Sequence, residues 1–221
     1  MSGAGSEPHG RRQDAIQKRY WMDGLNAGTG GRCDAVQLSE RGLKHSVTGF
    51  AQGRAGPIPR LVLLFRRGER SGLRMKRQDV LLAALASARP SKAFEPVHVQ
   101  KAMFLIDRRA KALFSRSKDQ RYHFVPYDYG PFDSRVYHDL DQLARDGLIS
   151  IDRNPEYGYR RYTATDLGRE QGERALDRMS DAHRGVVTDA ANFVLSLPFR
   201  ALVSAIYREF PEMKANSVFK A

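Results

Sequence analysis

The sequence predicts a mainly α-helical fold of the α+β class with one small β-hairpin, in the part of the chain that begins at Met75. Apolar residues recur there at spacings of three and four, which is typical of helices. They alternate with polar residues only around one turn-rich stretch, residues 148–163, which is typical of a hairpin. The preceding residues 1–74 hold 13 of the 19 glycines and only 4 of the 21 aromatic residues. We therefore expect residues 1–74 to be poorly ordered.

Residues 1–74 are also basic, with 13 Lys/Arg against 6 Asp/Glu, so they carry +7 of the formal net charge of +12. A basic arm of this kind adds sequence-independent attraction to phosphates. We favour the alternative that this Gly- and Arg-rich stretch is translated upstream DNA, which makes Met75 the expected natural start. N-terminal sequencing of protein made from its own gene separates the two interpretations.

Two helices are expected at the start of the folded region. Asp79 precedes "VLLAALASA", a run of good helix formers that ends before Arg89-Pro90, because a residue before proline is pushed out of the helical region. Pro96 fits the first turn of a second helix, whose wide apolar stripe indicates burial and which the polar "SRSKDQ" ends near Ser115. The following "RYHFVPY" predicts a short extended segment.

The stretch "YDYGPFDSRVYHDL" predicts the start of a third helix, over residues 133–146. Gly130-Pro131 breaks the chain, Asp133 caps the helix, and Phe132 and Tyr137 occupy the two positions of a hydrophobic staple. Gly147 ends the helix. The residues expected to face inward are Val136, Leu140, Leu143 and Ala144. The residues expected to face outward are Ser134, Arg135, His138, Asp139, Gln142 and Arg145.

The stretch "LISIDRNPEYGYRRYTAT" then predicts the hairpin, with an aromatic tip and a basic return strand. Thr165 caps a polar helix, a more apolar helix follows, and Pro198 opens the last one. The last helix has one apolar stripe that needs a partner surface, made of Phe199, Leu202, Val203, Ile206, Tyr207 and Phe210. We expect residues 171–221 to serve packing or homodimerisation.

Several classes of function are excluded by what the sequence lacks. The only cysteine is Cys33, so neither a disulfide framework nor a multi-cysteine metal site is expected, and a reducing cytoplasm fits. No apolar run approaches the roughly 18 residues of a membrane-spanning helix. His98 and His123 have no metal partner at helical spacing, and no nucleotide-binding or hydrolase motif occurs. We expect neither an enzyme nor a cofactor or metal.

The order of helix, helix, helix and hairpin across residues 78–170 resembles the winged-helix fold of bacterial transcription regulators. That resemblance implies a winged helix-turn-helix core over residues 75–170, with 133–146 as recognition helix and 148–163 as wing. More narrowly, "VQKAMFLIDR" followed by "YHFVPYDYGPFDSRVYHDLDQLARDGLI" resembles the Panacea, or SocA-like antitoxin, domain. In that family an apolar helix with a "QK" pair precedes a "YGP" turn, a marker that does not specify a ligand.

Two departures from these families bear on function. A standard helix-turn-helix joins its helices by three or four residues, whereas residues 116–130 intervene here. The third helix is also acidic, with Asp133, Asp139, Asp141 and Asp146 against Arg135 and Arg145. Because phosphate neutralisation supplies most non-specific affinity, a DNA contact must then draw positive charge from the hairpin.

The sequence therefore leaves two hypotheses. The first is a homodimeric regulator that binds double-stranded DNA. Its predicted contacts are Lys76, Arg77, Ser134, Arg135, His138, Gln142, Arg153, Tyr157, Tyr159, Arg160 and Arg161. The second is an antitoxin-like module that neutralises a protein encoded next to it, with Tyr127, Tyr129 and Phe132 as aromatic anchors. Several of these residues have a plain structural alternative: "YDYGP" as a turn and the basic hairpin as a solvated surface.

Overall fold

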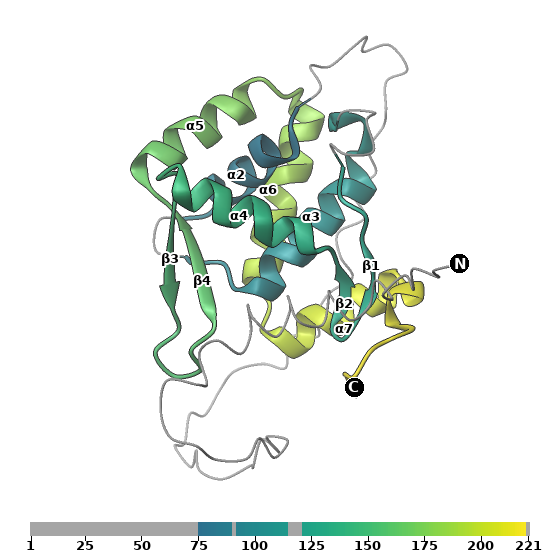
Figure 1. Cartoon of the computed structure of the whole chain (residues 1–221). Coiled ribbons are helices and arrows are strands. Elements are labelled where there is room, and N and C mark those ends of the chain that lie inside the picture. Colours follow the sequence, from purple (N-terminus) through teal and green to yellow (C-terminus); the bar gives the residue numbers. More distant parts are fainter. Residues whose placement is uncertain (1–74, 90–91, 115–120, 220–221) are drawn as a thin grey trace, which may run out of the picture.

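The computed structural model of the chain describes residues 75–89, 92–114 and 121–219. These residues form six α-helices and two separate antiparallel strand pairs, which is a mainly helical α+β fold (Figure 1). The predictions for residues 1–74, with Cys33, lie outside the described residues. None of the helices in the described ranges has the length and apolar character needed to cross a bilayer.

The first two helices form the centre of the fold. Helix α2 (Arg77–Ala86) begins two residues earlier than Asp79 and is buried from Val80 to its end. Helix α3 (Pro96–Arg109) has proline in its first turn and a capping box between Glu95 and His98. It ends well before Ser115, which corrects the expected length. The chain leaves the helix at Ala110 and forms a 3₁₀ turn, η1 (Lys111–Leu113), that puts Leu113 and Phe114 in the core.

A small hairpin replaces the expected break at Gly130-Pro131. Strand β1 (Val125–Tyr127) pairs with β2 (Gly130–Phe132), and Gly130 adopts the left-handed φ of +97° that closes the two-residue turn. Pro126 and Pro131 lie opposite each other in the ladder. They form a non-hydrogen-bonded pair, so neither residue has to supply a backbone N–H donor. Two prolines are therefore compatible with this short ladder, although each would disrupt a central strand.

Helix α4 (Ser134–Arg145) follows directly and confirms the third predicted helix. Asp133 caps it by accepting a hydrogen bond from the Arg135 backbone N–H at 2.9 Å, and the Phe132 and Tyr137 rings of the staple lie 5.8 Å apart. Gly147, with φ +71°, ends the turn after the helix.

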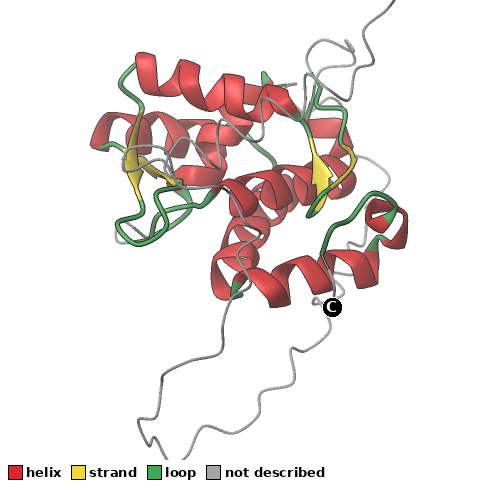
Figure 2. Cartoon of the chain, turned by 60° about the horizontal axis from the view of Figure 1, so that its bottom comes forward, coloured by secondary structure: helices red, strands yellow, loops and turns green. Residues whose placement is uncertain are grey.

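The hairpin predicted for residues 148–163 is also present, as the second hairpin of the fold. Strand β3 (Ile149–Arg153) pairs with β4 (Arg160–Ala164), with Asp152 opposite Arg161 and Arg153 opposite Arg160. Phe94 forms a bridge with Tyr162 on the other edge of β4, through hydrogen bonds of 2.8 and 2.9 Å in both directions. The two hairpins lie on opposite sides of the helices, with α4 running between them (Figures 1 and 2).

The C-terminal helices are α5 (Asp166–Asp177), α6 (Asp181–Ser196) and α7 (Phe199–Glu209), followed by the 3₁₀ turn η3 (Pro211–Lys214). Thr165 caps α5 as predicted, by accepting from the Gly168 N–H at 3.1 Å. The glycines of α5 permit a close approach: a Cβ at Gly172 would lie 2.4 Å from that of Ala86 on α2. Helix α5 can therefore pack tightly against α2.

The apolar stripe of the last helix is covered by the chain itself. Leu202, Val203, Ile206 and Tyr207 are buried, and the Phe210 ring packs edge-on against Phe104 of α3 with centroids 4.8 Å apart. Most of the stripe is thus core, and Phe199 and Phe210 are partly buried against it. One hydrophobic cluster runs from Met75 to Met213, and the boundary expected at residue 170 falls inside α5.

Candidate nucleic-acid interface and the polar cluster behind it

Helix α4 and the β3–β4 hairpin form one unit, because only three residues separate the helix from β3. On the outer side of α4, His138 and Arg145 are exposed, and Ser134, Arg135 and Gln142 are partly exposed. The structure places these five side chains outward, in agreement with the sequence. Arg145 donates a hydrogen bond of 2.6 Å to the Gln142 side chain, which in turn donates to Asp146 at 2.9 Å.

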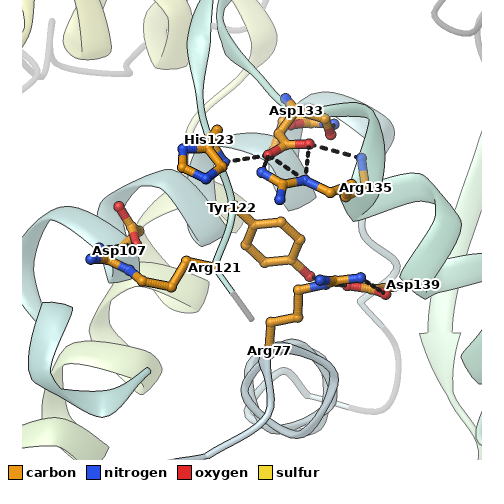
Figure 3. A network of polar contacts seen from close by, with 9 residues as sticks. Arg77, Asp107, Arg121, Tyr122, His123, Asp133, Arg135 and Asp139 are labelled. Atoms are coloured by element: carbon orange, nitrogen blue, oxygen red, sulfur yellow. Dashed lines mark hydrogen bonds and ion pairs between the residues drawn. The ribbon is translucent and has the colours of Figure 1, made fainter. Parts of the chain in front are cut away.

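Asp139 is the exception on this helix. Its side chain is fully buried, whereas its polarity led us to place it outward. The carboxylate accepts hydrogen bonds from Arg77 at 2.5 and 3.1 Å, from Gln78 at 3.1 Å and from the Tyr122 hydroxyl at 2.8 Å (Figure 3). Position 139 lies three residues after Val136 and four before Leu143, so its spacing belongs to the buried face.

Arg77 is therefore a structural residue, which corrects its prediction as a phosphate contact. Its guanidinium is bound by Asp139 and lies over the Tyr122 ring, 5.7 Å from the centroid. The hydrogen bond to Asp139 raises the pKa of Arg77, although burial opposes this. Burial and the Asp139 charge raise the pKa of Tyr122 well above its usual value, so the hydroxyl keeps its proton and remains a donor. The neighbouring Lys76 is exposed.

A second buried carboxylate, Asp133, holds the start of α4. It accepts from the Arg135 guanidinium at 2.6 Å, from the Arg135 backbone and from the His123 backbone N–H (Figure 3). Gln100 on α3 forms two hydrogen bonds with the Asp133 backbone. Its side-chain amide donates to the Asp133 carbonyl at 3.0 Å and accepts from the Asp133 N–H at 3.1 Å. Arg135 thus lies outward as predicted, but with its charge balanced by Asp133.

The two neighbouring arginines of the hairpin point to opposite faces. Arg160 lies two residues from the buried Tyr162, hence on the inner face, and donates to Asp141 of α4 at 2.8 Å. This corrects the expectation that both arginines face a partner. Arg161 lies on the outer face opposite Asp152, and its buried Nε has no hydrogen-bond partner. Arg160 is therefore held by an ion pair in the free protein, whereas Arg161 forms no ion pair with the residues that the structure describes.

The hairpin tip is held by side-chain hydrogen bonds. Asn154 accepts from two backbone N–H groups of the turn, and Arg153 donates to the Gly158 carbonyl at 3.2 Å. The Tyr159 hydroxyl donates to Glu95 at 2.8 Å, and burial together with this bond raises the pKa of Tyr159. Its ring lies parallel to Tyr157, with centroids 6.0 Å apart. Tyr157 is half-exposed and is the aromatic side chain that the tip presents.

The three predicted protein-contact residues are not equivalent. Phe132 is buried beneath the Tyr127 ring, 5.1 Å away, so its prediction as an exposed anchor is wrong. Tyr129 packs edge-on against Phe199 of α7 at 5.2 Å. Tyr127 and Tyr129 are only partly exposed, because both cover the hydrophobic core.

Sequence reasoning did not single out Gln100 and Lys101, which hold the segment before α4. Both are buried on α3, and the Lys101 ammonium donates to the Pro131 carbonyl at 3.2 Å. The "QK" pair and the "YGP" turn are thus in direct contact. The available signal was that two long polar side chains lie inside an otherwise apolar helix pattern.

No three His, Cys, Asp or Glu side chains converge as metal ligands in the ranges that the structure describes. No protein-family model matches this chain. A search of curated proteins gives no significant match.

Proposed function

We propose that the chain is a winged-helix regulator that acts in the cytoplasm and binds double-stranded DNA through α4 and the β3–β4 hairpin. The observation that supports it best is that helix and hairpin are fixed to each other with their outer sides exposed. The Arg160–Asp141 ion pair and the three-residue connection join the hairpin to α4. The Phe94–Tyr162 bridge and the Tyr159–Glu95 hydrogen bond hold the hairpin against the residues that precede α3. A preformed unit of this kind docks without first ordering its hairpin.

The positive charge that remains on this unit is small. Among the described residues, Arg145, Arg153 and Arg161 have no carboxylate partner. If each contacts one phosphate, the logarithm of the binding constant falls with the logarithm of salt concentration with a slope of about 3 per bound copy. We therefore expect binding that is measurable at low salt and weak at physiological salt unless two copies bind together.

Fluorescence anisotropy with a labelled duplex from the region upstream of the gene tests the proposal, between 50 and 200 mM salt. The double substitution Arg145→Ala and Arg161→Ala is expected to weaken binding to all duplexes and to lower the slope by about two units. Arg208→Ala is the matched control, because Arg208 is exposed and belongs to α7, a helix that lies away from the β3–β4 hairpin (Figure 1). His138→Ala is expected to change base preference. No binding by the wild type at 50 mM salt contradicts the proposal.

A protein-binding, antitoxin-like role is the second candidate. It is favoured by the balance of charge on α4, where Asp133 neutralises Arg135, Asp141 neutralises Arg160, and Asp146 is exposed. A surface with little net positive charge attracts DNA only weakly, and its carboxylates can pair with a basic partner. Co-expression with the adjacent gene separates the candidates: growth rescue that survives Arg145→Ala with Arg161→Ala favours this role.

We also propose that the protein forms a homodimer. The apolar stripe of α7 is not the proposed dimer interface, because most of it is buried in the core. Sedimentation of the full chain, with and without the duplex, measures the number of copies bound.

A further inference from the structure

A hollow lies between α3, the β1–β2 hairpin and the first turns of α4. The space between its walls is about 240 Å³ and includes open solvent, whereas the part that admits the centre of a water-sized molecule is about 10 Å³. Tyrosine and phenylalanine supply four of its eight lining residues, and one lysine is among the others. Its lining residues are Val97, Gln100, Lys101, Tyr127, Tyr129, Gly130, Phe132 and Tyr137.

This lysine is Lys101, which is 3% exposed. The Pro131 carbonyl, at 3.2 Å, is the acceptor that the structure gives its ammonium, so one of the three N–H donors is used. No carboxylate of the described residues forms an ion pair with it. A buried charge without a counter-ion is unfavourable, and here burial lowers the pKa of Lys101 to about 7.

The neighbouring groups do not supply the missing negative charge. Gln100 already uses its amide on the Asp133 backbone, and the Asp133 carboxylate is bound by Arg135 and the His123 N–H. Gly130 lies close to the ammonium: a Cβ at this residue would lie 3.7 Å from Lys101 Nζ and 3.1 Å from Cε1 of Tyr207. The titratable groups around Lys101 are the phenols of Tyr127, Tyr129, Tyr137 and Tyr207 and the carboxylates of Asp128 and Asp133.

We propose that this hollow binds a small carboxylate, whose oxygens pair with the Lys101 ammonium between the tyrosine rings. A carboxylate supplies the single negative charge that the site lacks, and charge-assisted hydrogen bonds are strongest where water is excluded. Its flat shape suits a wall of rings, whose edges carry partial positive charge. A phosphate is bulkier, carries more charge at neutral pH and needs more donors than one ammonium provides.

The site has a direct connection to α4. Lys101 holds Pro131 and Gln100 holds Asp133, so two adjacent residues of α3 fix the segment from which α4 begins. A carboxylate competes with the Pro131 carbonyl for the ammonium. Occupancy of the hollow is therefore expected to change the position of the start of α4, the proposed recognition helix.

Carbon-detected NMR of the isotope-labelled full chain, in the absence of DNA, tests the site. The probe is sodium acetate, with sodium chloride holding ionic strength constant and sodium phosphate as a second anion. We expect a saturable shift of the Lys101 Cε signal, with shifts at Tyr127 and Tyr129. The shifts at the two tyrosines are expected to be lost in Lys101→Met and retained in Lys92→Met, because Lys92 is exposed. Above pH 7 the apparent Kd is expected to weaken by up to about tenfold per pH unit, as the ammonium loses its proton.

Three results overturn the site: a Lys101 shift that does not saturate, tyrosine shifts unchanged in Lys101→Met, or binding by phosphate that is tighter than by acetate. If Lys101→Met does not fold, the wild-type pH dependence decides, and a Kd that is constant from pH 6 to 9 rejects the pairing. Because the NMR experiment contains no DNA, a negative NMR result does not test the proposed DNA binding. A failure to bind DNA likewise does not test the carboxylate site.

Discussion

Replacing Asp139 by asparagine tests whether one buried carboxylate joins α2, α4 and the segment before β1. The substitution keeps the side-chain volume but removes the charge that Arg77, Gln78 and Tyr122 all donate to. Breaking a buried ion pair by removing one partner costs about 3–5 kcal/mol. Because the Arg77 side chain is 18% exposed and is partly rehydrated, we expect the lower end, about 3 kcal/mol.

The free energy of unfolding, measured by urea titration with far-UV circular dichroism, gives this value directly. With a slope of about 2 kcal/mol per molar urea, the midpoint falls by about 1.5 M. Asp152→Asn is the control, since Asp152 is exposed on β3, and it is expected to stay within about 0.5 kcal/mol of the wild type. The reasoning is refuted if Asp139→Asn also stays within that range.

Three further results are expected. Gly172→Ala destabilises the protein in the same titration, because the new Cβ at residue 172 would collide with α2. Gly185→Ala stabilises the protein by about 0.5–1 kcal/mol, because the space around residue 185 is open. Lys101→Met stabilises the protein by about 5 kcal/mol below pH 7, where the folded wild type carries a buried charge, and the gain disappears by pH 10.5. Between these values the unfolded wild type binds a proton that the folded form lacks, so wild-type stability rises with pH. Arg160→Ala lowers the melting temperature by separating the hairpin from α4, whereas Arg161→Ala leaves it unchanged and weakens DNA binding only.

Local features of the sequence predicted the helices from α4 onward and the β3–β4 hairpin. Asp133, Thr165, Gly147 and Pro198 mark element ends through interactions with residues a few positions away, so their effects can be predicted without tertiary structure. The β1–β2 pairing was missed because its proline-containing strands do not resemble strands. It forms because Gly130 closes the turn and because Phe132 gains a buried position between Tyr127 and Tyr137.

The candidate site was harder to predict because its polar residues are satisfied by distant parts of the chain. Asp139 is buried because Arg77 and Gln78, more than 60 residues earlier, donate to it. Gln100 is buried because the backbone of residue 133 accepts and donates to its amide. Polarity alone therefore placed Asp139 on the wrong face, whereas its three- and four-residue spacing to Val136 and Leu143 indicated the right one.

Arg77, Arg135 and Arg160, which pair with aspartates of α4 or its N-cap, differ in how readily they can move to a phosphate. Arg77 is held, because its departure would leave the fully buried Asp139 without its cation. Arg135 can leave at lower cost, since Asp133 would keep the hydrogen bonds from the Arg135 and His123 backbones. Arg160 can also leave, because the Asp141 side chain is 28% exposed and can be hydrated.

Exchange of these two ion pairs therefore decides which partner α4 accepts. DNA binding gains two cations if Arg135 and Arg160 turn to phosphates, which raises the expected salt slope from about 3 towards 5. A basic protein partner also requires the two pairs to open, but its cations then bind the Asp133 and Asp141 carboxylates. A measured slope near 5 would show that the two pairs open on DNA, whereas a slope near 3 would show that they stay closed and that only the outer arginines bind.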